Sequence, residues 1–417
     1  MKKDLFFKKL KILKGQNSTL INDSVMIIDG KIKAFGAEAR KYASSKNIKE
    51  SDPGKKILAP LLVDIHSTLK DPISGFEDNL IHLKFRAKRS GFGVIAIKPD
   101  STDWRDKPEK IPFQQNKNDE VKIYFWGSLT IQNQGLKLSP NEELLKSGAI
   151  GLSTNLFDDP SIIFKALSLI TKESYPLLIT PKINSSNPKA FVNEDINSLQ
   201  SGLYSINNFS DYLNLKKIFE INHHFPNKKI IIENICDTKT CEELKLNDNS
   251  IFGSISWWNL VADTGNLKID DMGWKVYPPI CDEGIRERLI GYIDKNIIQS
   301  IAVNSLALND QETFKPINER NYGISSYELV LPLLWTELIS KRNFNISKLW
   351  DFLSFKPSEI LNLPLESLQE DSNRWLIFDP DYYWYNNQTN LGYESPSNFP
   401  KKDDLIKGKV IASGLAL

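Results

Sequence analysis

The sequence predicts an α/β protein: a (β/α)8 barrel of the TIM type with a small β-sandwich domain made from both termini. Through the middle of the chain, short apolar runs rich in β-branched residues alternate with helical patterns, which is typical of repeated βα units. Both ends instead carry short strand patterns. The 417 residues are enough for one large barrel with an appendage. We predict the small domain from residues 1–60 plus 366–417, and the barrel from residues 61–365.

Residues 1–60 read as short strands. The run 25–36 is interrupted by Asp29-Gly30, a two-residue turn signal that predicts a hairpin. The following run, 61–66, is apolar and β-branched and ends in the polar residue His66. This pattern is typical of a strand buried on both faces, so we place the first barrel strand there.

The barrel region continues with alternating strand and helix patterns. Strand candidates are 93–98, 122–126, 150–153, 176–180, 229–233 and 300–304, and helical patterns include 161–172 and 211–224. The last stretch changes character again, because strand patterns at 374–380 and 407–413 flank the aromatic run 382–385. We expect this aromatic run to pack inside the end domain.

The composition excludes several classes of function. Lys plus Arg is 53 and Asp plus Glu is 52, and a formal net charge of +1 gives no general attraction for nucleic acid or an anionic membrane. Lysines interrupt the apolar residues of the first turns, so no signal peptide is expected, and no apolar run is long enough for a membrane span. The three cysteines form no Cys-x-x-Cys pair, which fits a reducing cytoplasm.

Histidine is scarce, and this limits any metal centre. The four histidines are His66, His82, His223 and His224. His82 lies in a helical pattern, and the pair His223-His224 lies near a helix end, where imidazolium suits the helix dipole.

Motifs spread over nearly the whole chain resemble the dihydroorotases of the cyclic amidohydrolase family. The segment after the first barrel strand resembles the family's His-x-His pair followed by Leu-Arg-Asp-Pro. Other segments are similar to its Gly-Gly-Phe-Thr, Pro-Asn-Thr and Asn-Pro-Pro-Leu-Arg motifs and to its C-terminal signatures. The order and spacing of these segments carry the resemblance: 58–72, 90–93, 98–100, 278–279, 323–332 and 377–380.

The resemblance implies one or two zinc ions that generate hydroxide near neutral pH, and an Asp on strand eight that moves the proton. His66 keeps the first ligand position. Neutral side chains stand at the other ligand positions: Thr68, Thr154, Thr180 and Asn234. Asn304 stands at the position of the catalytic Asp and cannot accept a proton from water. We therefore expect no intact catalytic residue and no zinc cofactor.

The resemblance also implies an altered substrate pocket. Lys70 stands in place of the Arg that holds the substrate carboxylate, and Asp100 and Tyr277 each stand in place of an Asn. An Asp100 carboxylate a few ångströms from a substrate carboxylate would cost about 1–4 kcal/mol. This opposes binding of dihydroorotate.

Two classes of function remain. The first is a dihydroorotase-like protein without dihydroorotase catalysis, which has a structural or regulatory role in pyrimidine biosynthesis. The resemblance then implies aspartate carbamoyltransferase, or a second copy of this chain, as the partner. The second is an enzyme that hydrolyses a cyclic amide by altered, metal-free chemistry centred on His66, Lys70 and Asp100. Whether the chain is an enzyme therefore stays open at this point.

Overall fold

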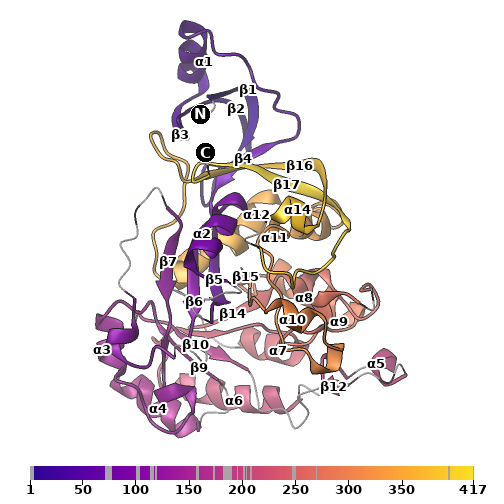
Figure 1. The fold of residues 1–417 in the computed structure, drawn as a ribbon. Coiled ribbons are helices and arrows are strands. Elements are labelled where there is room, and N and C mark those ends of the chain that lie inside the picture. Colours follow the sequence, from indigo (N-terminus) through magenta and orange to yellow (C-terminus); the bar gives the residue numbers. More distant parts are fainter. Residues whose placement is uncertain are drawn as a thin grey trace.

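The computed structural model confirms the predicted fold class, an α/β barrel with a smaller β unit (Figure 1). It describes residues 4–416 apart from 71–77, 100–103, 113–116, 118–119, 156–158, 172–173, 182–189, 195, 201, 203, 207–208, 247–249, 269 and 393–394.

The small unit contains one six-stranded sheet built from both ends of the chain. Its strand order is β17-β16-β4-β1-β2-β3. The bounds are β1 Leu5–Ile12, β2 Ile21–Ile28, β3 Lys31–Phe35, β4 Ile57–Pro60, β16 Trp375–Tyr385 and β17 Leu405–Ser413. Strand β4 pairs parallel with β1 and antiparallel with β16, and thereby joins the N-terminal strands to the C-terminal hairpin. The domain boundaries at residues 60 and 366 stay a prediction.

The N-terminal strands contain the predicted hairpin and one element that the sequence reading missed. Asp29 and Gly30 both have positive φ, 49° and 78°, as a tight turn between β2 and β3 requires. Helix α1, Gly36–Ser45, lies in a stretch that we predicted as strand only. Ala39 and Ala43 are one helical turn apart and bury one face of α1 against the sheet, and Tyr42 packs against the same cluster.

The barrel strands run parallel to one another. They are β5 Leu62–Thr68, β6 Phe92–Lys98, β7 Lys122–Phe125, β8 Gly127–Ser128, β9 Leu152–Asn155, β10 Leu177–Thr180, β13 Ile230–Ile232, β14 Ile251–Ser256 and β15 Ser300–Ala302. Only Trp126 separates β7 from β8, so these two strands share one position in the barrel. At the other side, Thr68 N–H donates to Ser305 O at 2.8 Å and Asn304 N–H donates to His66 O at 3.2 Å. The first and last barrel strands are therefore neighbours.

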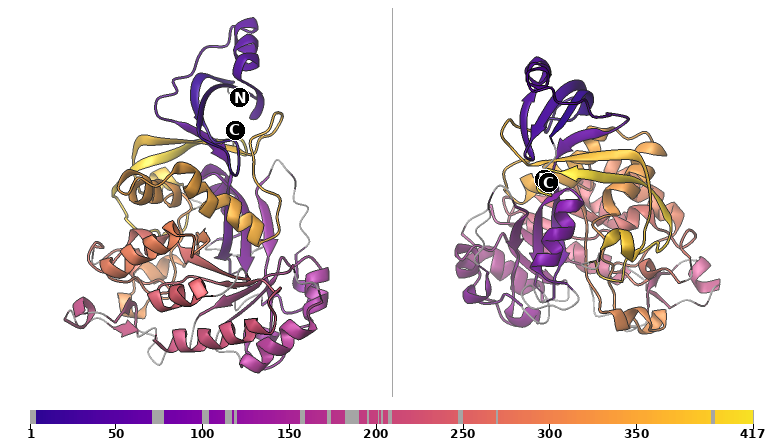
Figure 2. Two further views of the ribbon diagram at one scale, coloured as in Figure 1. Left: turned by 180° about the vertical axis from the view of Figure 1, so that it is seen from behind. Right: turned by 45° about the horizontal axis from the view of Figure 1, so that its top comes forward.

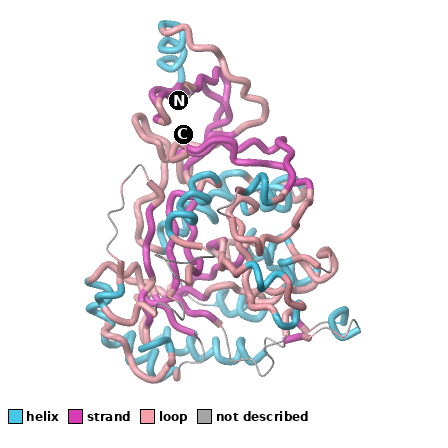
Figure 3. Tube along the Cα trace, in the orientation of Figure 1, coloured by secondary structure: helices cyan, strands magenta, loops and turns pink. Residues whose placement is uncertain are grey.

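Helices cover the outside of these strands (Figures 2 and 3). The larger ones are α2 Leu80–Arg89, α4 Pro160–Leu169, α6 Phe209–His223, α7 Thr238–Leu246 and α9 Glu283–Asp294. The C-terminal part of the barrel adds five consecutive helical segments: α11 Val330–Leu334, η5 Trp335–Ser340, α12 Ile346–Trp350, η6 Asp351–Phe355 and α13 Lys356–Ile360. Shorter helices include α3 Asn141–Lys146, α8 Trp258–Val261, α10 Asp310–Thr313 and α14 Gln388–Leu391. Among the described residues, no helix combines the length and apolar character needed to cross a membrane.

The small sheet lies at the N-terminal ends of the first barrel strands. Arg374, just before β16, donates to Gly93 O at 2.8 Å and forms an ion pair with the buried Glu366. A Cβ at Gly91 would meet Leu376 of β16 at 2.5 Å, which shows how closely the two units approach. The opposite, C-terminal ends of the barrel strands remain available for a site.

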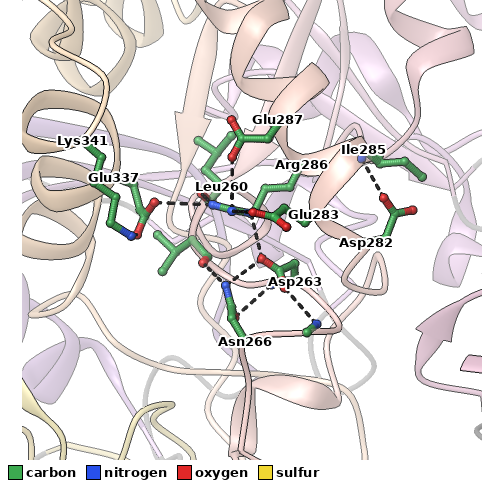
Figure 4. Close-up of polar contacts among 12 residues, drawn as sticks. Leu260, Asp263, Asn266, Asp282, Glu283, Ile285, Arg286, Glu287, Glu337 and Lys341 are labelled. Atoms are coloured by element: carbon green, nitrogen blue, oxygen red, sulfur yellow. Dashed lines mark hydrogen bonds and ion pairs between the residues drawn. The ribbon is translucent and has the colours of Figure 1, made fainter. Parts of the chain in front are cut away.

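A buried ion network joins two of the outer helices (Figure 4). The Arg286 guanidinium of α9 forms ion pairs with Asp263 at 3.0 Å, with Glu337 of η5 at 3.4 Å and with Glu287 at 3.2 Å. Arg286, Asp263 and Glu337 are all buried. The network therefore fixes α9 against η5 and against the loop after α8.

The aromatic run 382–385 differs from our expectation. Only Trp384 is buried, and its indole N–H donates to Gly408 O at 2.9 Å. Tyr382, Tyr383 and Tyr385 are 45%, 58% and 57% exposed. The prediction that the whole run packs inside the domain is wrong, because the three tyrosine side chains are exposed, and lysine ammonium groups of β17 lie over the rings of Tyr382 and Tyr383.

Gly151, just before β9, provides a test of the barrel packing. A Cβ at this position would lie 2.3 Å from Pro176 O and 2.5 Å from the buried Trp126 ring. We expect Gly151→Ala to lower the free energy of unfolding by about 1–3 kcal/mol, as overpacking typically does. Gly291 of α9 is the matched control, since a Cβ there meets nothing within 4 Å. Gly291→Ala should be neutral or stabilising in the same urea titration, and equal losses in both variants would contradict this packing.

Candidate functional site

A cavity of about 290 Å³ opens at the C-terminal ends of the barrel strands, where barrel enzymes place their catalytic groups. Most of its walls are polar side chains at or just after strand ends. The predicted site residues that line it are Thr68, Thr154, Thr180, Asn234, Tyr277 and Asn304, and Lys98 and Glu233 line it as well. The structure therefore brings most of the predicted positions together.

His66 lies beneath this cavity and is completely buried. Its Nε2 is 2.8 Å from the Ser254 hydroxyl, and its Nδ1 has no hydrogen-bond partner among the described residues. Burial lowers the pKa of His66 to about 4, although the nearby Glu233 carboxylate opposes this shift. The imidazole is therefore neutral at physiological pH and is held in a structural contact.

The charged groups of the cavity are Lys98 and Glu233, which the sequence reading did not single out. Lys98 Nζ lies 2.6 Å from Glu233 Oε1 and 3.4 Å from Thr180 Oγ1. Burial is the largest effect on the pKa of Glu233 and would raise it, but the Lys98 ammonium, His66 and a hydrogen bond with Thr180 together lower this pKa. The carboxylate is therefore ionised and paired at neutral pH.

A signal for this pair was present in the sequence. Lys98 ends one apolar strand run and Glu233 follows another, and they carry opposite charges. The carboxyl ends of parallel barrel strands meet at one mouth, so two such residues are natural partners there. The two residues are 135 positions apart in the sequence, so a motif at one strand end does not reveal its partner at the other.

Two asparagines at strand ends adopt left-handed backbone conformations. The φ angles are 53° at Asn234 and 50° at Asn304, a region that asparagine tolerates better than most residues. The Asn304 side-chain amide donates to Tyr277 O at 3.2 Å. Tyr277 in turn donates its hydroxyl to Pro181 O at 2.8 Å and packs edge-to-face against Tyr322. Asn304 thus holds the cavity rim together.

The metal-free set of His66, Lys70 and Asp100 that the sequence suggested is described only in part and stays a prediction. Lys70 is not among the described residues that line the cavity, and its charge acts instead on Glu312, whose pKa it helps to lower. The physical reason is that Lys70 lies two residues beyond the end of β5, where the chain has already left the strand. Asp100 lies outside the described residues.

The described residues do not fit a zinc site. Structural or catalytic zinc takes at least three protein ligands from imidazole, thiolate or carboxylate groups. Within the described ranges, no three His, Cys, Asp or Glu side chains lie close enough to hold a metal ion. His66 and Glu233 are the strongest donors near the cavity, and the first contacts Ser254 while the second contacts an ammonium group.

Asp64, two residues before His66, is a second buried carboxylate that the sequence reading did not assign. It accepts hydrogen bonds from Val303 N–H at 2.9 Å and the Tyr327 hydroxyl at 2.8 Å, and also from Ser67. Burial raises the pKa of Asp64 to about 6, against the effect of these donors. Since Asp64 lies on β5 and Val303 follows β15, this carboxylate helps to join the first barrel strand to the last.

Comparisons with known proteins agree with this architecture. No family model matches the chain. The chain is 28% identical over 398 residues to a "Probable dihydroorotase-like protein" of Synechocystis, with 86% of this chain and 88% of that protein covered. It is 23% identical to a "Dihydroorotase" of Staphylococcus epidermidis, with 88% and 87% covered. These proteins are its homologues.

The solved structures show the same fold at lower sequence identity. The L-hydantoinase (dihydropyrimidinase) of Arthrobacter aurescens superposes with a TM-score of 0.73 at 14% identity, covering 98% of this chain and 94% of the other. The dihydropyrimidinase of Brevibacillus agri gives a TM-score of 0.70 at 14% identity, covering 99% and 94%. The barrel and the small β unit together are therefore a fold that solved hydantoinases share.

Proposed function

We propose that this dihydroorotase-like chain, which has the fold of the cyclic amidohydrolases, lacks dihydroorotase catalysis and has a structural or regulatory role in pyrimidine biosynthesis. One observation carries the proposal. In the part of the chain that the structure describes, the mouth of the barrel holds a paired Lys98 and Glu233 together with neutral strand-end side chains, and no group of three metal-binding side chains.

The chemistry of amide hydrolysis explains why this arrangement argues against turnover. The reaction needs an activated water and a group that moves its proton. Asn304 is neutral and contacts Tyr277, and the buried imidazole of His66 lies below the cavity against Ser254. Glu233 has a lowered pKa and a bound ammonium, so it is a weak base. Each of these three described groups is already held in another interaction.

A second candidate function is supported by the same ion pair. Glu233 Oε2 is buried at the cavity and has no hydrogen-bond partner among the described residues. An enzyme that hydrolyses a cyclic amide without metal would use this oxygen to accept a proton, with the Lys98 ammonium beside the developing oxyanion. Such activity would be independent of metal and dependent on Glu233.

A dihydroorotase assay in both directions tests these two candidates. We expect the purified protein to give only background rates, with or without added zinc, beside an active dihydroorotase as control. Asn304→Asp should also stay at background, because catalytic groups that act as a unit are strongly non-additive and one repaired position gains almost nothing. Turnover that survives a chelator, follows the protein through chromatography and disappears in Glu233→Gln would establish the metal-free enzyme instead.

The proposed partner is tested separately from the chemistry. A structural role requires a stable complex, and the family resemblance names aspartate carbamoyltransferase. We expect this chain and the aspartate carbamoyltransferase of the same organism, when they are co-expressed, to elute together in size-exclusion chromatography. The apparent mass should exceed that of either protein alone. Separate elution at micromolar concentration would reject this partner, and the elution of this chain alone reports whether it associates with itself.

A further inference from the structure

We infer that the Lys98 ammonium is a built-in cation at the barrel mouth, which takes the place of a divalent metal and excludes one. The inference rests on one part of the proposed function, namely that the cavity at the barrel mouth holds no metal ion. It goes further, because it attributes the exclusion of a metal ion to Lys98 and not only to the missing histidines.

The position of Lys98 is the first argument. It is the last residue of β6, and its Nζ reaches Glu233 after β13 and Thr180 at the end of β10. A single ammonium thus joins the ends of three barrel strands. It also lies close enough to His66 for its charge to disfavour the imidazolium. Any metal ion that used Glu233 and His66 would have to share this place with a positive charge.

The second argument is the balance of charge in a buried place. The Glu233 side chain is only 1% exposed, and an ionised carboxylate taken out of water needs a cation close by. Lys98 meets this need within the chain, with 16% of its side chain exposed. The strand ends therefore keep their negative charge compensated whether or not a metal ion is available.

The third argument is the set of donors that would remain without Lys98. Glu233 Oε2 and Asn234 Oδ1 are buried and have no hydrogen-bond partner among the described residues. Thr180 lines the same cavity, and its hydroxyl interacts with the Glu233 carboxylate. These are oxygen donors, which suit a hard cation such as Mn²⁺ better than zinc. Removal of the ammonium would leave the Glu233 carboxylate without its cation, in a cavity that the Thr180 hydroxyl and Asn234 also line.

The experiment is a titration with Mn²⁺, in which electron paramagnetic resonance measures the free ion. We expect Lys98→Met to bind close to one equivalent of Mn²⁺, with an affinity at least tenfold above any binding by the wild-type protein. Mn²⁺ should also raise the melting temperature of Lys98→Met alone. Lys98→Met combined with Glu233→Gln should lose both effects, because the carboxylate is gone.

A surface variant and a milder substitution complete the design. Lys245→Met removes an ammonium from the exposed partner Glu242 and should gain no Mn²⁺ affinity. If Lys98→Met does not fold, Lys98→Gln removes the charge while keeping a donor for Glu233, and it should show the same gain. Equal Mn²⁺ binding by wild type and variants, or binding that survives Glu233→Gln, would overturn the inference. So would the absence of any gain in the folded Lys98 variants. Dihydroorotase turnover by the wild type would instead overturn the proposed function and leave these titrations valid.

Discussion

Arg286→Met should lower the free energy of unfolding by about 3–5 kcal/mol, the range found when one partner of a buried ion pair is removed. The arginine lies 3.0 Å from Asp263 and 3.4 Å from Glu337, and all three residues are buried (Figure 4). Methionine fills a similar length but leaves the Asp263 carboxylate buried without its cation. Urea unfolding followed by circular dichroism measures the loss.

Two further variants separate charge from packing at Arg286. Glu283→Gln removes a carboxylate that is 77% exposed and 3.8 Å from the guanidinium, so it should change the stability by less than about 1 kcal/mol. Asp263→Asn combined with Arg286→Met should recover part of the loss, because no buried charge is then left unpaired. An Arg286→Met variant as stable as Glu283→Gln would contradict the network as described.

Asp64 should make the stability fall as the pH rises. Its pKa is about 6 in the folded protein against 3.8 as the ordinary value, and the cause is burial. Between these two pKa values the folded state binds more protons than the unfolded state, so protonated Asp64 stabilises the fold. This stabilisation is fully present below the pKa of the unfolded state and is lost as the pH rises through the pKa of the folded state. From about pH 4.5 to about pH 7.5 the loss is about 2 kcal/mol. Asp64→Asn should remove this part of the pH dependence.

The measurement is the difference in unfolding free energy between wild type and Asp64→Asn at several pH values. It should shift in favour of the variant by about 2 kcal/mol across that window. Tyr327→Phe is a second test, because it removes a hydroxyl that stabilises the Asp64 carboxylate. The pKa of Asp64 should then rise further, and the loss of stability should occur at higher pH. Parallel curves for wild type and Asp64→Asn would show that Asp64 does not titrate in this range.

Much of the fold was predictable because its signals are local. The Asp29-Gly30 turn, the apolar run that became β5 and the alternation of strand and helix patterns each depend on neighbours in the sequence. Helix α1 was missed because its buried face consists of small alanines, which give a weak periodic signal beside strongly patterned strands. The tyrosines of β16 were misplaced because composition does not show which face of a hairpin is covered.

The candidate site was predictable only in part, for a different reason. Positions such as Thr68, Thr180 and Asn304 follow from the strand ends and were found at the cavity. The contact between Lys98 and Glu233 joins residues far apart in sequence, and its distance depends on the barrel as a whole. The position of Lys70 depends likewise on where the chain leaves β5. Such facts belong to the closed tertiary structure and have no local signature.

The sheet that joins both ends of the chain sets an order of events during synthesis. Strand β4 can pair with β1 as soon as the first sixty residues are made, but its other edge pairs with β16, where Pro60 faces Trp375 roughly 300 residues later. At about 5–20 residues per second the ribosome needs about 15–60 s to cover that distance. During this time the apolar edge of β4 is a template for pairing with other chains. We therefore expect nascent chains that stop before β16 to aggregate or to be retained by chaperones, whereas the finished chain closes this edge with its own last hairpin.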